Sequence, residues 1–280
     1  MKRISLAAAA VAGTAACLSA GLATADVARG QYLVETVMGC GNCHTPLGPN
    51  GFEMDAQFSG RVVEDSGAFT AVAANITPAS RIADWSDAEL ARSIREGVRP
   101  DGSIIGPPMP FSVYREISDD DLASIVAFLR TVPAVENDAG ESEYRIPLPP
   151  SYGPPVQEVS APDPGVTVEY GEYLTALAHC MECHSPMTPT GPDLGAGLGT
   201  GGFEFHGPWG TSIAPNITNG PDGLADYTED ELKAMITQGI RPDGSPMLPP
   251  MPYPFLAQMT GDDLDAIILY LRSLPGQDGA

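Results

Sequence analysis

Apolar residues recur with helical spacing near the end of each half of the chain. After Ser118 and after Thr260, apolar side chains fall at positions i, i+3, i+4 and i+7, so one stripe of each segment faces a core. The two stripes are Leu122, Ile125, Val126 and Leu129, and Leu264, Ile267, Ile268 and Leu271. Pro133 and Pro275 end the pattern. The spacing therefore predicts one amphipathic helix at the end of each half.

Capping signals predict further short helices. Each half contains a capping box, in which a Ser or Thr is followed three residues later by Glu, and each box precedes a segment that closes at a glycine. The boxes are Ser86-x-x-Glu89 and Thr228-x-x-Glu231, and the closing glycines are Gly97 and Gly239. Helices are also expected at Tyr32-Leu33-Val34 and at Tyr173-Leu174. No stretch shows sustained strand alternation, so an all-α fold is expected.

The chain contains a tandem duplication. Several segments of the first half recur in the second half at a nearly constant offset. The matching pairs are Gly30-Gln31-Tyr32-Leu33 with Gly171-Glu172-Tyr173-Leu174, Asn75-Ile76-Thr77 with Asn216-Ile217-Thr218, Arg99-Pro100-Asp101-Gly102-Ser103 with Arg241-Pro242-Asp243-Gly244-Ser245, and Pro107-Pro108-Met109-Pro110 with Pro249-Pro250-Met251-Pro252. Two copies of one small domain are expected, over residues 26–133 (the first repeat) and 169–280 (the second repeat).

The remaining segments are predicted to be a leader and a linker. Residues 134–168 are rich in proline and lack apolar periodicity, which is typical of an extended connector. Residues 1–25 combine an early Lys and Arg with an uncharged Ala-rich stretch, and Ala23-Thr24-Ala25 is typical of a signal peptidase site. We expect cleavage after Ala25 and a periplasmic location. An uncleaved anchor and lipidation at Cys17 are the alternatives, and either of these or a partner would be the route to a membrane.

Charge excludes one class of partner. The 280 residues carry 14 Lys and Arg against 36 Asp and Glu, a net charge of -22, which repels phosphate backbones. No nucleic acid partner is therefore expected. Gly 31 and Pro 28 are above average usage, which favours short helices joined by irregular loops.

Four cysteines lie in two identical motifs. Cys40-Gly41-Asn42-Cys43-His44 and Cys180-Met181-Glu182-Cys183-His184 both read C-x-x-C-H. In this spacing two thiols add to the vinyl groups of a haem and the next His ligates the iron. Disulfides, a thioredoxin-like pair and a shared zinc site are weaker alternatives, because none of them requires a His after each pair. Two covalently bound haem c groups are predicted, with His44 and His184 as iron ligands.

These motifs resemble class I cytochromes c, and more narrowly the cytochrome c subunits of periplasmic alcohol- and aldehyde-type dehydrogenases. The resemblance rests on G-x-Y-L before C-x-x-C-H, the N-I-T segment, the R-P-D-G-S loop, P-P-M-P and the final helix, and it covers nearly the whole chain apart from the linker and the leader. It implies helices around each haem, with the first and last crossing, and a His and a loop Met on the two sides of each iron.

The second axial ligand follows from the residues available. The first repeat has no His besides His44, so a methionine or an open position remains. Met109 stands between two prolines that restrict its loop, and it is the predicted ligand. The repeat register places Met251 on Met109, so Met251 is the predicted ligand in the second repeat, with Met247 and His206 as alternatives.

Arginine and other polar residues complete the predicted sites. Arg99 and Arg241 occupy equivalent positions in a chain with few cations, and partly buried haem propionates need cationic partners. Contact with the propionates is the hypothesis for both, and surface exposure is the alternative. Residues considered for the pocket walls are Asn75, Asn216, Trp85, Tyr227 and Trp209.

A haem iron filled on both sides favours outer-sphere electron transfer over catalysis. The resemblance implies a dihaem carrier without catalytic residues, which takes single electrons from a dehydrogenase and delivers them to a cytochrome or a terminal oxidase. The alternative is a peroxidase-like dihaem enzyme with one open iron. A subunit that docks a catalytic partner to the membrane is a third interpretation.

Overall fold

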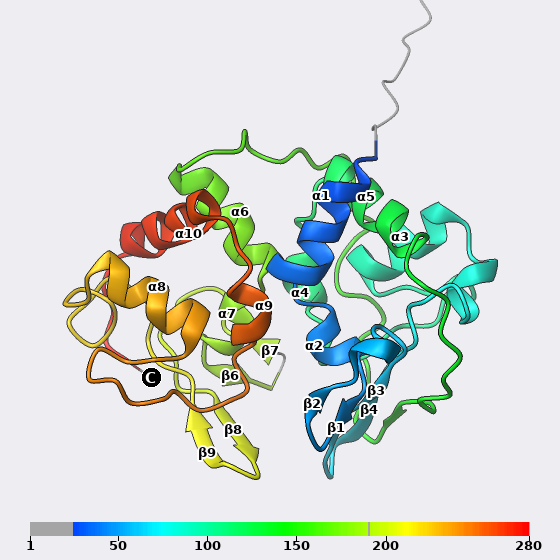
Figure 1. Cartoon of the computed structure of the whole chain (residues 1–280), viewed down its shortest axis with the longest axis horizontal. Coiled ribbons are helices and arrows are strands. Elements are labelled where there is room, and N and C mark those ends of the chain that lie inside the picture. Colours follow the sequence, from blue (N-terminus) through cyan, green and yellow to red (C-terminus); the bar gives the residue numbers. More distant parts are fainter. Residues whose placement is uncertain (1–24, 190, 280) are drawn as a thin grey trace, which may run out of the picture.

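The computed structural model describes residues 25–189 and 191–279, and the two repeats fold into a similar succession of elements (Figure 1). The elements of the first repeat are α1 (Val27–Tyr32), the π-helix η1 (Leu33–Val37), α2 (Gly41–His44), β1 (Leu47–Gly48), β2 (Gly51–Phe52), η2 (Met54–Ala56), β3 (Arg61–Asp65), β4 (Phe69–Ala73), η3 (Arg81–Asp84), α3 (Asp87–Glu96), α4 (Phe111–Tyr114) and α5 (Asp119–Leu129).

The second repeat keeps this order in shorter form. After β5 (Glu143–Tyr144) in the linker come α6 (Val168–Leu177), α7 (Cys180–Cys183), β6 (Met187–Thr188), β7 (Gly191–Pro192), β8 (Glu204–Gly207), β9 (Gly210–Ile213), α8 (Glu229–Gln238), α9 (Tyr253–Leu256) and α10 (Gly261–Ser273). The capping boxes open α3 and α8, and both helices end at a glycine in the left-handed conformation, as predicted.

The first and last helices of each repeat cross at a glycine. A Cβ on Gly30 would lie 1.9 Å from the carbonyl oxygen of Ser124, and one on Gly171 would lie 1.9 Å from that of Ala266. Only glycine lets the two backbones approach this closely. The glycine of the G-x-Y-L motif therefore marks the contact of α1 with α5 and of α6 with α10. The apolar stripes predicted on α5 and α10 are buried in this packing.

The expectation of an all-α fold was wrong. Within the described residues, nine short strands form four small antiparallel sheets. Seven of these strands span only two or four residues, too few for alternation to stand out in the sequence. The longest, β3 and β4, carry a bulge at Val62/Glu64 that breaks the regular alternation of faces.

The proline-rich linker is extended, and it packs on the first repeat. Its β5 pairs with β4. Tyr144 Oη donates to the carbonyl of Pro107 at 2.7 Å, and Tyr152 Oη donates to that of Ile105 at 2.9 Å. Both acceptors belong to the loop that carries Met109. The linker therefore fastens this loop as well as connecting the repeats.

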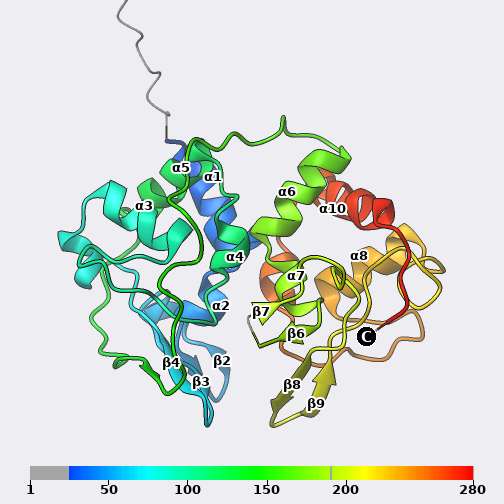
Figure 2. The ribbon, with the colours of Figure 1, turned by 180° about the vertical axis from the view of Figure 1, so that it is seen from behind.

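The two repeats share one hydrophobic core, to which α5 contributes Ile125 and α10 contributes Ile267. In both views α2 and α4 of the first repeat face α7 and α9 of the second across the middle of the molecule (Figures 1 and 2). No helix in the described part of the chain combines the length and hydrophobicity needed to cross a membrane.

Candidate haem sites

The two C-x-x-C-H motifs form equivalent helical turns. Cys40 is the N-cap of α2, and α7 begins at Cys180. All four motif cysteines are free thiols and are half-buried. Burial raises the pKa of Cys40, Cys180 and Cys183 to about 12 and also raises that of Cys43. None of the four is in a disulfide, so their arrangement is compatible with the haem attachment that the motif spacing predicts.

Each motif histidine is oriented by a backbone carbonyl. His44 Nδ1 donates to the carbonyl of Ala74 at 2.7 Å, and His184 Nδ1 donates to that of Pro215 at 2.8 Å. Burial lowers the pKa of both imidazoles, which favours the neutral ring. A proton held on Nδ1 leaves the Nε2 lone pair available for a metal. Both histidines therefore fit the role of a haem iron ligand.

The N-I-T motif supports these carbonyls. Asn75, next to Ala74, accepts from Thr77 N at 2.9 Å and donates to the carbonyl of Val135 at 2.8 Å. Asn216, next to Pro215, makes the same contacts with Thr218 and Gln277. The sequence suggested pocket walls for the two asparagines, and the structure gives them this anchoring role. The acceptor carbonyls were missed, although each immediately precedes an N-I-T motif.

A glycine closes the loop behind each histidine. Gly60 N donates to the carbonyl of His44 at 2.7 Å, and Gly201 N donates to that of His184 at 2.9 Å. Gly60 has φ +90 and Gly201 has φ +78, and a Cβ on either would lie 2.6 Å from a backbone carbonyl. This shared contact aligns Gly60 with Gly201.

The predicted methionine ligands lie in equivalent loops. Met109 O accepts from Phe111 N and Met251 O accepts from Tyr253 N, both at 2.9 Å, directly before α4 and α9. Both methionines are half-buried, and the Pro-Pro bond before each is cis. Met247 N donates to the carbonyl of Gly239, as Ile105 N does to that of Gly97. The structural match of Met247 with Ile105 leaves Met251 as the counterpart of Met109.

The predicted propionate partners contact their own loops. Arg99 Nη1 donates to Ser103 Oγ at 3.2 Å and to the carbonyl of Ile104 at 3.0 Å. Arg241 Nη1 donates to the carbonyl of Pro246 at 2.8 Å. These contacts hold the R-P-D-G-S turns that lead into the methionine loops, and propionate binding by the two arginines stays a prediction.

The two other histidines have different surroundings. His206 lies on β8 with its side chain 71% exposed, and its Nδ1 is 3.1 Å from Thr211 Oγ1. His179 packs edge-on against Tyr114, with ring centroids 6.3 Å apart, and hydrogen bonds the backbone of Met38. His179 therefore belongs to the contact between the repeats.

The two C-x-x-C-H turns lie near each other. The Phe255 ring of α9 lies 2.9 Å from where a Cβ on Gly41 would stand, so it packs on α2. On the other side Ser112 of α4 hydrogen bonds the carboxyl of Glu182 in α7. Burial is the largest cause of the raised pKa of Cys183, and Cys43 in the opposite turn lies close enough to add to it. The contact between the repeats thus brings the two C-x-x-C-H turns together (Figure 1).

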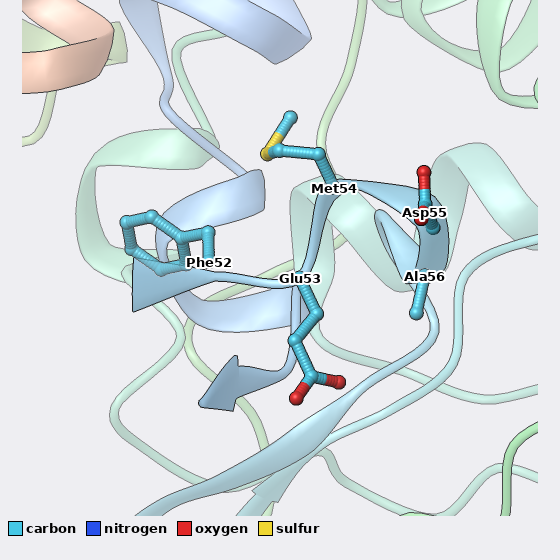
Figure 3. A pocket seen from close by; sticks show the side chains of 5 residues that line it. All are labelled: Phe52, Glu53, Met54, Asp55 and Ala56. Carbon is cyan, nitrogen blue, oxygen red and sulfur yellow. The ribbon is translucent and has the colours of Figure 1, made fainter. Parts of the chain in front are cut away.

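A surface hollow lies beside this region, next to the first turn. Figure 3 shows that Phe52, Glu53, Met54, Asp55 and Ala56 line it. A second hollow shares Met54 and Asp55 and extends to Phe58 and Phe128. The cysteines, histidines and methionines predicted to bind haem line neither hollow. We therefore assign no bound molecule to either hollow.

Two charged residues beside the turns were missed from the sequence. Arg61 Nη2 donates to the carbonyl of Asn42, between the first two cysteines, at 2.8 Å. Glu182 lies between the second two, where burial raises its pKa to about 7. Apart from the C-x-x-C-H motif, no sequence pattern near these two residues marks them as part of the site.

Similarity to known proteins extends over most of the chain. No protein-family profile matches it. The chain is 28% identical over 276 residues to the fructose dehydrogenase cytochrome subunit of Gluconobacter japonicus, covering 90% of this chain and 53% of the relative. It is 30% identical over 275 residues to the cytochrome c subunit of a quinone alcohol dehydrogenase of Gluconobacter oxydans, covering 89% and 55%. The chain thus spans about half the length of these two relatives.

A relative of similar length is the dihaem c-type cytochrome of Cereibacter sphaeroides. The identity is 29% over 277 residues, which cover 92% of this chain and 88% of the relative. Both repeats therefore lie within the matched region. The homologues of this chain are cytochrome c subunits of quinone alcohol, fructose and gluconate dehydrogenases and a dihaem cytochrome c, and they imply that it carries covalently bound haem c.

Proposed function

We propose that this chain is an exported dihaem c-type cytochrome that carries single electrons from a dehydrogenase to a downstream cytochrome or terminal oxidase. The observation that carries the proposal is the pair of equivalent imidazoles. His44 and His184 each follow a C-x-x-C turn, and each has Nδ1 engaged by a carbonyl so that Nε2 is available.

Different residues of each repeat have different roles in binding a haem. Cys40 and Cys43 in one repeat, and Cys180 and Cys183 in the other, supply the covalent attachment. His44 and His184 would supply nitrogen ligands for the irons. A haem c bound in this way supplies a reversible one-electron couple.

The distal side is assigned to the methionine loops. Met109 and Met251 would supply thioether ligands for the irons, and Arg99 and Arg241 would supply positive charge for the propionates. The linker tyrosines Tyr144 and Tyr152 support the loop of Met109. Thioethers held by these loops would favour electron transfer over binding of a substrate at a haem iron.

The contact between the repeats supports transfer within the chain. The turns of Cys43 and Cys183 lie near each other at this contact. The packing of α9 on α2 and the bond between α4 and α7 hold this arrangement. A fixed separation between two redox centres suits a short electron relay.

The location is proposed from the N-terminal sequence, and the type of partner is proposed from the net charge. We assign residues 1–25 to a signal peptide, and residues 1–24, including Cys17, lie outside the described residues. Asp26, the first residue after the proposed cleavage, caps α1 by accepting from Ala28 N and Arg29 N. The net charge of -22 favours a redox partner with a basic docking patch.

The test is an optical spectrum of the purified holoprotein, oxidised and reduced, with and without carbon monoxide and peroxide. We expect two haems per chain, both low-spin in each state, and no binding of either reagent. Binding of carbon monoxide to one haem together with peroxide turnover would contradict the carrier function and would indicate a peroxidase-like enzyme.

A further inference from the structure

The two attachment turns differ in charge at one aligned position. Gly60 and Gly201 are equivalent, because each donates its N–H to the carbonyl of the motif histidine. The next residue is Arg61 in the first repeat and Gly202 in the second. The first repeat therefore has a side-chain cation that the second lacks at this place.

The Arg61 guanidinium is held against the first turn. Its Nη2 donates to the carbonyl of Asn42 at 2.8 Å, and its Nη1 donates to that of Val62 at 3.3 Å. Its Nε is buried and has no hydrogen-bond partner within the described residues. The positive charge of Arg61 therefore lies directly against the turn that carries Cys40, Cys43 and His44.

The R-P-D-G-S loops of the two repeats carry equal charges, so they do not cancel this difference. Arg99 and Asp101 in the first repeat have the counterparts Arg241 and Asp243 in the second. Glu182 takes the place of Asn42 and brings a carboxyl, not a cation, to the second turn. Arg61 thus leaves the first turn the more positive of the two.

Positive charge near a redox centre favours its reduced form, because reduction adds an electron. One elementary charge about 12 Å away, at an effective dielectric constant of about 20, changes the reduction equilibrium about tenfold. We propose that Arg61 gives the haem of the first repeat the higher reduction potential, so that a single electron shared by the two irons resides mainly in the first repeat. One iron is reduced as the other is oxidised, and no bond forms or breaks. This inference rests on the proposed function.

The test is a spectroelectrochemical titration of the holoprotein with a charge series at one position. The series is the unmodified protein, Arg61→Lys, Arg61→Gln and Arg61→Glu. We expect Arg61→Gln to lower the potential of the higher component only, changing the electron distribution between the haems about tenfold. Arg61→Glu should lower it further, and Arg61→Lys should preserve it.

Arg92→Gln is the matched control. Arg92 lies on α3 with its side chain 51% exposed and paired with Glu96, so this variant changes net charge equally, away from the turns. The inference is overturned if Arg61→Gln moves the lower component, moves neither, or shifts the potentials no more than Arg92→Gln does. The inference is also overturned if Arg61→Lys lowers the potential of the higher component as much as Arg61→Gln does, because packing and not charge would then be responsible. An unmodified holoprotein without two reversible haem components would instead contradict the proposed function.

Discussion

Tyr32 Oη of the first repeat donates to Asp263 Oδ2 of the second repeat at 2.6 Å, and Tyr173 Oη of the second donates to Asp121 Oδ2 of the first at 2.7 Å. Each hydroxyl also accepts from the N-cap residue of the opposite terminal helix, Tyr32 from Thr260 N and Tyr173 from Ser118 N. The tyrosines of the two G-x-Y-L motifs therefore exchange equivalent contacts. This reciprocity is typical of a two-fold related interface.

Tyr32→Phe should destabilise the protein by about 1.5–3 kcal/mol, because a hydrogen bond to a carboxylate is lost and Asp263 loses its donor. Denaturant unfolding of the holoprotein measures this. Tyr227→Phe is the control, since the Tyr227 hydroxyl makes no hydrogen bond in the described part of the chain. Equal unfolding free energies for Tyr32→Phe and the unmodified protein would contradict the role of this contact.

Alkaline pH should weaken the same contact. Burial and the bond to Asp263 raise the pKa of Tyr32 to about 12, above its ordinary value of 10.0. A raised folded pKa contributes stability that is complete below pH 10 and is lost as the pH rises toward 12. The stability difference between the unmodified protein and Tyr32→Phe should therefore shrink across this range. Unfolding curves at a series of pH values measure it, and a constant difference would refute the assignment.

Gly30→Ala should destabilise the first repeat by about 1–3 kcal/mol, because its Cβ would overlap the carbonyl of Ser124 in α5. Thermal unfolding provides the measurement. Gly67→Ala is the matched control, since a Cβ there meets nothing within 4 Å. If both variants melt alike, the close crossing of α1 and α5 does not require glycine.

Met109→Leu and Met251→Leu should each lower the potential of one haem and open it to carbon monoxide, because leucine keeps the bulk and removes the thioether. Optical spectra and carbon monoxide titration follow this change. Met54→Leu is the control, since Met54 is 58% exposed and lies outside the P-P-M-P loops. An unchanged low-spin spectrum in either variant would show that its methionine is not the ligand.

The residues proposed for the two sites could be selected from the sequence because their signals are local. The cysteines, His44 and His184 stand in fixed spacing, and the repeat placed Met251 on Met109 without three-dimensional information. The helices were predictable for the same reason, since capping boxes and apolar stripes involve residues within one or two turns. The small sheets were missed because two-residue strands leave no periodic pattern.

The sequence by itself determined the duplication, the two haem-attachment motifs and the helices that frame them. Tertiary structure alone decided what surrounds them. Three sets of contacts join residues distant in sequence. They are the bonds from the imidazoles to the carbonyls of Ala74 and Pro215, the tyrosine contacts between the repeats, and the bond from Arg61 to the first turn. Backbone carbonyls carry no sequence signature, and a charge affects a redox centre according to distance in space, so only the folded chain could supply them.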